Sequence, residues 1–511
     1  MWNRILSQYS SKLPKFNDKM LLGFRESKID AIPDYLDELF KQSVHMLDKY
    51  LPPEKDRLGY VGYSELTPEE RVTYIRSKNN FSKKFEIQPS NFKIIKFEFR
   101  FREESFFMHV DVPFLDDHAL MVSGIDYYPQ FALVEKGGMH RIDDEVLLQV
   151  MRAKLKFWRR DRETFVTTDG RTFREVNVTC KIHQKSSAKR KYPPLLVYSL
   201  ATIGSFDKTM EFYLGKPGII QLTTTPKEEK GYTYIEVKPD IFLKVTEEGL
   251  TDQAVRRVIT SLVVIYRFHG KFSVKDLQDV YYYRVAVGKW TYPTVSDNEL
   301  LYKNAVNHLN MNESMLDMSA KIQHRSIGIK ADTMDELLRQ AFHDIDKWIS
   351  SYQGNNLYQK KLGALDQMMS GLVRSFNTKL FNSIINSKTG LTRENVNKLM
   401  MAGMYKSWIS TSPMYRGRPI RYNDNYLLTI GAKRFRSTEN DEMGGTKSTK
   451  SELPKSVLLA HPSQMVVESI LCYPSSAPIE SGSINPFLQI DDDGNVIPPE
   501  WAHEIETIFD G

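Results

Sequence analysis

The chain has 511 residues, which is too long for one hydrophobic core and predicts roughly three domains. An apolar content of 41% and a charged content of 26% are typical of a soluble globular protein, and 12% aromatic residues argue against disorder. The net charge of +6 permits a nucleic-acid partner without requiring one, so local clusters of cations must decide that question.

Cysteine usage and hydropathy exclude several classes of protein. Only Cys180 and Cys472 occur, far apart in sequence, which argues against a structural zinc site and fits a reducing compartment. The N-terminal segment lacks the apolar core of a secretory signal, and the longest apolar run, residues 262–265, is too short to cross a bilayer. We therefore expect an intracellular protein without a membrane partner.

The first part of the chain mixes helix and strand patterns. Ile32–Phe40 opens an amphipathic helix with proline and acidic residues at its start, and Thr67–Glu70 is a capping-box pattern that opens a second one. Residues 92–101 partly alternate between apolar and polar, as a half-buried strand does. Residues 110–114 and 119–124 predict two further short strands.

Residues 140–300 predict a separate mixed unit with a basic edge. That edge comprises Lys154, Lys156, Arg159, Arg160 and Arg162, and a polar basic loop follows at 181–191. Apolar patterns then predict helices at 195–201, 254–268 and 274–285, and strands at 218–225 and 232–238.

Residues 300–400 are mainly helical in pattern. Thr333–Glu336 is another capping box, which opens a helix through Trp348. Farther on, apolar residues recur at helical spacing from Leu365 to Ile385, and Lys360 and Lys361 form a polar lead-in to this helix. A cation pair at the mouth of a buried helix suits a phosphate backbone, and the alternative is a solvated lysine pair before a core helix.

Residues 401–511 are rich in glycine, proline and serine and carry basic loops among tyrosines. The basic segments are 416–421, 433–436 and 447–450. Cations and aromatic rings on loops suit a nucleic-acid backbone or exposed bases, and ordinary solvated loops are the alternative.

The sequence contains no self-sufficient catalytic motif of the common kinds. Asp491–Asp493 could hold Mg²⁺, but Asp-Gly favours a surface turn. Asp344 and Asp346 fit the wet face of a helix better than a metal site, and His461 fits a structural role. We therefore expect no metal site in this chain.

The stretch Asn355–Phe376 resembles a segment of the bacterial RNA polymerase β subunit with the pattern D-H-x-G-N-R-R-L-R-x-V-G-E-L, without a gap. Lys360-Lys361-Leu362 take the place of its Arg-Arg-Leu, and Asp366-Gln367-Met368 that of its Gly-Glu-Leu. Arg374 falls close to the Gln-Phe-Arg of that family.

Four other segments resemble the same family in the same order. They are Val112–Asp126 (F-P-x-M-T…F-I-I-N-G-x-E), Tyr192–Asp207 (I-P-x-x-x-L-L-R-A-L-G-x-S-D), Asn425–Ser437 (N-P-L…T-H-K-R-R-L-S) and His461–Asn485 (H-P-T…N-I-G-L-I-N). The chain departs from the family at Tyr426 and Ala432, where the family has Pro and His. The likeness covers about the N-terminal half of a β subunit, as in the split polymerases of giant bacteriophages.

The resemblance implies an α+β, multidomain fold, with an RNA polymerase β-like protrusion and lobe followed by a loop-rich fork region. Residues 1–140 and 310–400 would form the protrusion, and residues 141–309 the lobe inserted into it. Residues 401–511 would form the fork region that lines the RNA–DNA hybrid.

The resemblance also implies DNA-templated RNA synthesis by a multi-subunit polymerase in the cytoplasm of an infected bacterial host, or packaged in the virion. Mg²⁺ would be held by a partner β′-type subunit, so this chain would have no catalytic residue. Partners would be a C-terminal β-type subunit, split β′-type subunits, DNA template and RNA product, with a promoter-specificity subunit as a further candidate. The nucleic-acid-binding residues would be Lys360, Lys361, Arg374, Lys433, Arg434 and Arg436.

Two other functions remain open from the residues alone. One is a non-catalytic nucleic-acid-binding or virion structural protein, which would be stable without polymerase partners. The other is a phosphodiesterase using Asp491–Asp493, which would show metal-dependent activity as an isolated chain.

Overall fold

The structure is a computed structural model that describes much of the chain in separate stretches. These are residues 32–48, 56–79, 92–113, 120–122, 125–127, 131–142, 144–150, 154–182, 192–227, 229–268, 272–313, 315–350, 356–363, 373, 375–380, 382–383, 390–401, 434–437, 462–467, 481–483, 485, 488–491 and 494–500. The chain divides into two compact units, Met1–Lys136 with Gln353–Gly511, and Gly137–Tyr352. In sequence, the second unit is inserted into the first.

The boundaries of the inserted unit differ in part from the predicted ones. The first lies close to the predicted 140/141, but the chain returns at 353 rather than at 310. Residues 310–352 pack into the inserted unit because their apolar side chains, among them Leu337 and Phe342, belong to its core. Helical periodicity revealed these helices but carried no information on which core they join.

The N-terminal part of the first unit is a three-stranded antiparallel sheet covered by a helix. Its strands are β1 (Leu58–Glu65), β2 (Phe92–Phe101) and β3 (Glu104–Pro113), in that order. Helix α2 (Ile32–Asp48) packs against β1. The bounds of β2 agree with the strand predicted from alternation.

Aromatic side chains join this sheet to a distant part of the chain. The Phe40 ring of α2 lies 5.1 Å from the Phe97 ring and 4.9 Å from the Phe376 ring. Phe376, within the helical residues 375–380, is fully buried. The predicted apolar face of the 365–385 helix is therefore buried at Val373, Phe376 and Leu380, whereas Leu365 to Leu372 and Ile384 to Ile385 lie outside the described residues.

Four shorter elements also belong to this part of the first unit. Helix α3 (Pro68–Asn79) begins with the predicted capping box, in which Thr67 N donates to Glu70 Oε2 at 3.0 Å and Glu70 N donates to Thr67 Oγ1 at 3.3 Å. Strands β4 (Leu120–Val122) and β5 (Ile125–Tyr127) form a hairpin. Helix α14 (Arg393–Met400) packs near β3.

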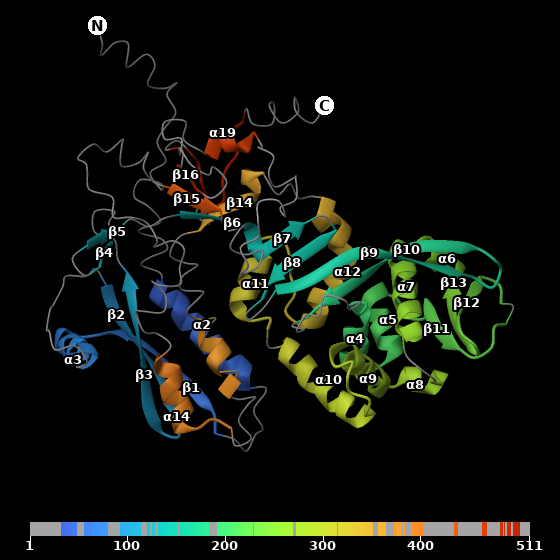
Figure 1. Ribbon diagram of the computed structural model, residues 1–511, viewed down its shortest axis with the longest axis horizontal. Helices are drawn as coiled ribbons and strands as arrows, with labels where there is room; N and C mark the ends of the chain where they lie inside the picture. Colours follow the sequence, from blue (N-terminus) through green and yellow to red (C-terminus); the bar gives the residue numbers. More distant parts are fainter. Residues whose placement is uncertain are drawn as a thin grey trace, which may run out of the picture. The chain divides into compact units, whose positions relative to one another are not determined.

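The described residues of the inserted unit form two antiparallel sheets (Figure 1). The larger has the order β10-β9-β8-β7, formed by β7 (Met139–Ile142), β8 (Glu145–Gln149), β9 (Lys154–Val166) and β10 (Thr172–Lys181). The smaller has the order β11-β13-β12, formed by β11 (Ile220–Thr223), β12 (Tyr232–Lys238) and β13 (Ile241–Thr246). The predicted strand at 232–238 is confirmed.

Helices pack against these sheets around one hydrophobic core. They are α4 (Leu196–Thr202), α5 (Phe206–Leu214), α6 (Glu247–Thr251), α7 (Gln253–Phe268), α8 (Val274–Gln278), α9 (Val280–Thr291), α10 (Asn298–Glu313), α11 (Met318–Arg325) and α12 (Met334–Ser350). Helix α7 contacts β9, β10 and β12, while α4 is buried and contacts α7, α9 and α12. The helix predicted at 274–285 is broken at Asp279, which caps α9 by accepting from Tyr281 N at 2.9 Å.

A partly buried ion-pair network ties α12 to α7 and β9. Arg257, 3% exposed, pairs with the Asp346 carboxylate, and Arg159 donates to the same carboxylate at 2.6 Å. Glu175 lies 3.9 Å from Arg257. Asp346 is thus the centre of a structural network rather than part of a merely solvated face.

Candidate nucleic-acid interface

The candidate interface is built on a second sheet of the first unit, with the order β14-β6-β15-β16. Strand β6 (Phe131–Glu135) lies between β14 (Lys360–Gly363), which is antiparallel to it, and β15 (Arg434–Ser437), which is parallel to it. Strand β16 (Ser481–Ser483) pairs with β15. We call these four strands the junction sheet; they gather with α19 (Ser463–Val467) in Figure 1.

The junction sheet brings together two cation clusters that are far apart in sequence. Leu133 of β6 is paired with Leu362 on one side and with Ser437 on the other. Adjacent strands lie about 4.8 Å apart, so β14 and β15 are separated by roughly 10 Å. Four of the six predicted nucleic-acid-binding residues therefore lie on two strands of one sheet.

The pairing register divides these cations between the two faces of the sheet. Directly paired residues share a face, and neighbours along a strand alternate. Lys361 is paired with Val134, and Arg436 with Ala132, so both belong to one face, and Arg434 joins them two residues before Arg436. Lys360, paired with Glu135, belongs to the opposite face.

Burial separates the two lysines in the same way. Lys360 is 2% exposed, whereas Lys361 is half-buried. The prediction that Lys360 and Lys361 form a polar lead-in to a helix is wrong. A 3₁₀ turn, η4 (Leu357–Gln359), leads into strand β14, which contains both lysines. The alternation of a strand turns one of two consecutive lysines inward, so only Lys361 retains exposure in this chain.

The other predicted site residues are only partly described. Arg434 and Arg436 are placed by the backbone of β15. Arg374 and Lys433 lie outside the described residues. The predicted nucleic-acid contacts of all six side chains stay predictions.

Lys136 is a cation of this site that sequence reasoning missed. It follows β6 directly, and its Nζ donates to the Tyr358 carbonyl at 3.0 Å. Burial lowers the pKa of Lys136, and attraction to the nearby Asp491 carboxylate opposes that effect. A single lysine before two glycines carries no pattern that distinguishes it from a surface residue.

Two further segments close around the junction sheet. Ser463 of α19 accepts a hydrogen bond from Leu357 N at 2.8 Å, and Asn485 donates through Nδ2 to the Val466 carbonyl at 2.9 Å. A backbone bridge joins Lys361 to Asn495. Three of the segments that resemble the bacterial β subunit therefore contribute residues to this sheet or to its neighbours. They are Asn355–Phe376, Asn425–Ser437 and His461–Asn485.

Asp491 forms a turn, as expected. Its carboxylate accepts from Asn495 N at 2.8 Å and from Asn495 Nδ2 at 2.7 Å. Asp492 and Asp493 lie outside the described residues. In the described part of the chain, no three His, Cys, Asp or Glu side chains lie close enough to hold a metal ion.

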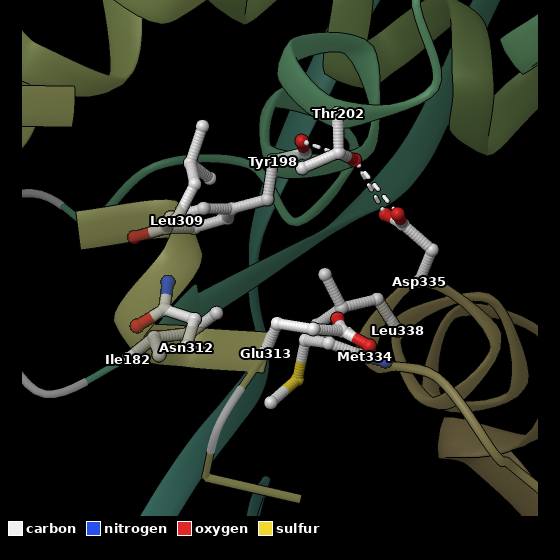
Figure 2. Close-up of a pocket in the computed structure, with 9 residues that line it drawn as sticks. All are labelled: Ile182, Tyr198, Thr202, Leu309, Asn312, Glu313, Met334, Asp335 and Leu338. Atoms are coloured by element: carbon white, nitrogen blue, oxygen red, sulfur yellow. Dashed lines mark hydrogen bonds between the residues drawn. The ribbon is translucent and has the colours of Figure 1, made fainter. Parts of the chain in front are cut away.

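The inserted unit contains a small pocket between α4, α10 and α12 (Figure 2). On one side, Asp335 accepts hydrogen bonds from Ser199 at 2.7 Å and from Thr202 at 2.8 Å. Burial raises the pKa of Asp335, and these hydrogen bonds lower it. Asn312, 2% exposed, lines the other side, and its amide atoms have no hydrogen-bond partner among the residues that the structure describes. These contacts join α12 to α4.

A family model described as "non-virion RNA polymerase subunit" matches residues 2–500. The chain belongs to this family. It is therefore a subunit of an RNA polymerase, an assembly of several chains that works on nucleic acid. No curated protein matches the chain. Among the described residues, no helix is both long and apolar enough to cross a membrane.

Proposed function

We propose that the chain is the N-terminal β-type subunit of a split, multi-subunit DNA-directed RNA polymerase. In this role it would form one wall of the cleft that holds DNA and RNA. The observation that carries the proposal is the junction sheet. There, β14, β15, β16 and α19 lie together, and each comes from a segment that resembles the bacterial β subunit.

The proposed role of the junction sheet is electrostatic. Lys361, Arg434 and Arg436 share one face by register, and cations on one face neutralise phosphates of a nucleic-acid backbone. Lys360 is proposed to hold β14 in place, since its burial keeps it from solvent. Partner β′-type subunits would hold Mg²⁺, which neutralises the charge that develops during nucleotidyl transfer.

Co-expression tests the subunit assignment. The chain is co-expressed with the other polymerase subunits encoded by the same source and purified through an affinity tag. We expect it to co-purify with large subunits, one of which bears an NADFDGD-like motif. If the tagged chain is recovered alone and stable while those subunits assemble without it, the assignment is wrong.

A triple substitution, Lys361→Ala with Arg434→Ala and Arg436→Ala, tests the face of the junction sheet. We expect assembly to persist, and the lifetime of stalled elongation complexes to be shorter than in the wild type at low and moderate salt and to depend less steeply on salt. About three lost phosphate contacts would weaken retention by roughly 10-fold or more at moderate salt.

A matched control replaces three cations of the same unit that pair with carboxylates. Arg102 pairs with Asp56, Arg393 with Glu104 and Lys398 with Glu394. Replacing these three by alanine removes the same charge, so the lifetimes should stay close to the wild type. Equal losses in both triple variants would show a general charge effect and would count against the interface.

The alternative functions have less support. The family description names a non-virion polymerase subunit, which argues against a virion structural protein. Asp491 is held by Asn495 in a turn, which argues against its use in a phosphodiesterase. A nucleic-acid-binding accessory subunit of the polymerase remains the second candidate, and the co-expression experiment separates it by whether assembly requires this chain.

A further inference from the structure

Two lysines face each other across two adjacent strands of the inserted unit. Lys156 of β9 and Lys181 of β10 are direct cross-strand partners. Side chains at such positions have Cβ atoms about 4.5–5.5 Å apart, and like charges there destabilise the sheet. An arrangement of this kind calls for a compensating anion.

Aromatic rings hold both ammonium groups. Trp158 and Tyr192 stack with ring centroids 4.4 Å apart and an interplanar angle of 12°. The Lys156 Nζ lies 5.6 Å from the Trp158 centroid, and the Lys181 Nζ lies 5.6 Å from the Tyr192 centroid. Attraction to the ring faces fixes the two cations on a rigid base.

The local charge is only partly compensated. Glu145 lies 3.7 Å from the Lys156 Nζ. No carboxylate pairs with Lys181 among the residues that the structure describes, and burial together with the nearby Lys156 lowers the pKa of Lys181. The sequence between Ile182 and Tyr192 contains four lysine or arginine residues and no acidic residue.

The four side chains lie on the face of the sheet opposite its core. Lys156 and Trp158 alternate with Leu155 and Phe157, which are fully buried. Lys156 keeps 37% of its side chain exposed and Lys181 is half-buried, so an anion can reach both from solvent.

We propose that Lys156 and Lys181, held on the Trp158–Tyr192 stack, form a second nucleic-acid contact in the inserted unit, where a backbone phosphate lies between the two ammonium groups. The identification of the anion rests on the proposed function, since an RNA polymerase subunit works beside a polyanion. A phosphate would remove the repulsion between the lysines by contacting both. The site is distinct from the junction sheet in both residues and strands.

The experiment measures binding of a fluorescent 30-nucleotide single strand and the matching duplex to the purified full-length chain, from about 50 to about 400 mM salt. We expect Lys156→Ala with Lys181→Ala to weaken binding several-fold at low salt. Loss of one phosphate contact should make the plot of log K against log salt less steep. The slope should become less negative by about 0.7 for the single strand and by about 0.9 for the duplex. The single variant Lys181→Arg, in which Lys156 is unchanged, should keep the affinity of the wild type because it retains the positive charge.

Lys244→Ala is the matched control. Lys244 belongs to the same unit and lies 4.0 Å from the Tyr232 ring centroid, but it has Glu229 as a carboxylate partner. Its removal should leave both the affinity and the salt slope unchanged. Thermal unfolding of all variants checks that the fold persists.

Competition with inorganic phosphate and with tripolyphosphate separates the sources of the anion. If the lysine variants lose tripolyphosphate binding but keep nucleic-acid binding, the site takes a free phosphate compound and the proposal is wrong. Unchanged salt slopes for the double variant would also overturn it. Co-purification with the large subunits is scored separately, so failure of the subunit assignment is distinguishable from failure of this site.

Discussion

Lys360 and Lys361 are adjacent in sequence but lie in different surroundings. From the sequence, both lysines are predicted to act together as a pair of cations. No local pattern identifies the four-residue strand Lys360–Gly363 that contains them. Pairing with β6 makes them different, since it gives them opposite faces of the junction sheet. Burial of one lysine could be known only once its distant strand partner was known.

Other single residues acquired roles that their types did not reveal. Asp346 lies on a solvent-accessible helix face, as predicted, with 37% of its side chain exposed, and it also joins Arg159 to Arg257. Its spacing within α12 was read correctly, but its cationic partners come from β9 and α7. Such networks depend on contacts between residues far apart in sequence, which periodicity does not record.

The burial of His324 should make the stability of the inserted unit depend on pH. His324 is 1% exposed, and its Nε2 lies 2.9 Å from the Gln149 carbonyl. Burial lowers the pKa of His324 from 6.5 to about 4, although the hydrogen bond to Gln149 opposes this shift. The folded state therefore binds fewer protons than the unfolded state between these two pH values, and stability falls as the pH decreases through this window.

We expect the free energy of unfolding to fall by about 2 kcal/mol on account of His324 when the pH is lowered from 7.5 to 5. His324→Gln keeps a donor for the Gln149 carbonyl but does not titrate, so it should remove that part of the pH dependence. Urea denaturation of both proteins at the two pH values measures the difference. Identical pH dependence in wild type and variant would show that His324 is not the titrating group.

At the scale of elements, local signals predicted several strands and helix starts, but strand β1 was not predicted and β3 begins at Glu104 rather than at residue 110. Alternation located β2, and apolar patterning located β12, at their observed bounds, and two capping boxes located the starts of α3 and α12. These elements are determined by hydrogen bonds and side-chain periods within a few residues. The junction sheet was not predicted, because its strands are short and are paired over long distances in sequence.

Helix α9 crosses α10 at a glycine. A Cβ atom added to Gly288 would lie 2.6 Å from the Leu301 carbonyl oxygen, which belongs to the backbone and cannot rotate away. We expect Gly288→Ala to destabilise the inserted unit by about 1–3 kcal/mol, despite the better helix propensity of alanine.

Lys289→Ala, at the next position of α9, serves as the comparison because it changes helix propensity without adding an atom at the crossing. Thermal unfolding of the two variants gives the measurement. A transition for Gly288→Ala at or above the wild-type temperature would mean that α10 moves freely with respect to α9.

At the scale of the whole molecule, the two units differ in how the chain builds them. The inserted unit is continuous in sequence and has its own core, whereas the first unit combines segments on both sides of it. Phe40 and Phe376 illustrate this, since they pack together across the insertion.

We expect a fragment of residues 137–352 to fold by itself, whereas residues 1–136 alone should not, because they lack Phe376 and strand β14. Far-ultraviolet circular dichroism and urea unfolding of both fragments provide the measurement. A cooperative transition is expected for the inserted unit only. A fragment 137–352 that stays unfolded where the full chain folds would show that its core depends on the first unit.

The central position of β6 has a consequence for synthesis on the ribosome. Roughly 300 residues separate Glu135 from Ser437, and at about 5–20 residues per second the second neighbour of β6 emerges roughly 15–60 seconds after β6 itself. During this interval one edge of β6 has no native partner strand, and such edges are prone to pair with other chains. Nascent-chain folding, chaperone demand and yield at high expression levels should therefore depend on how quickly the ribosome reaches β15.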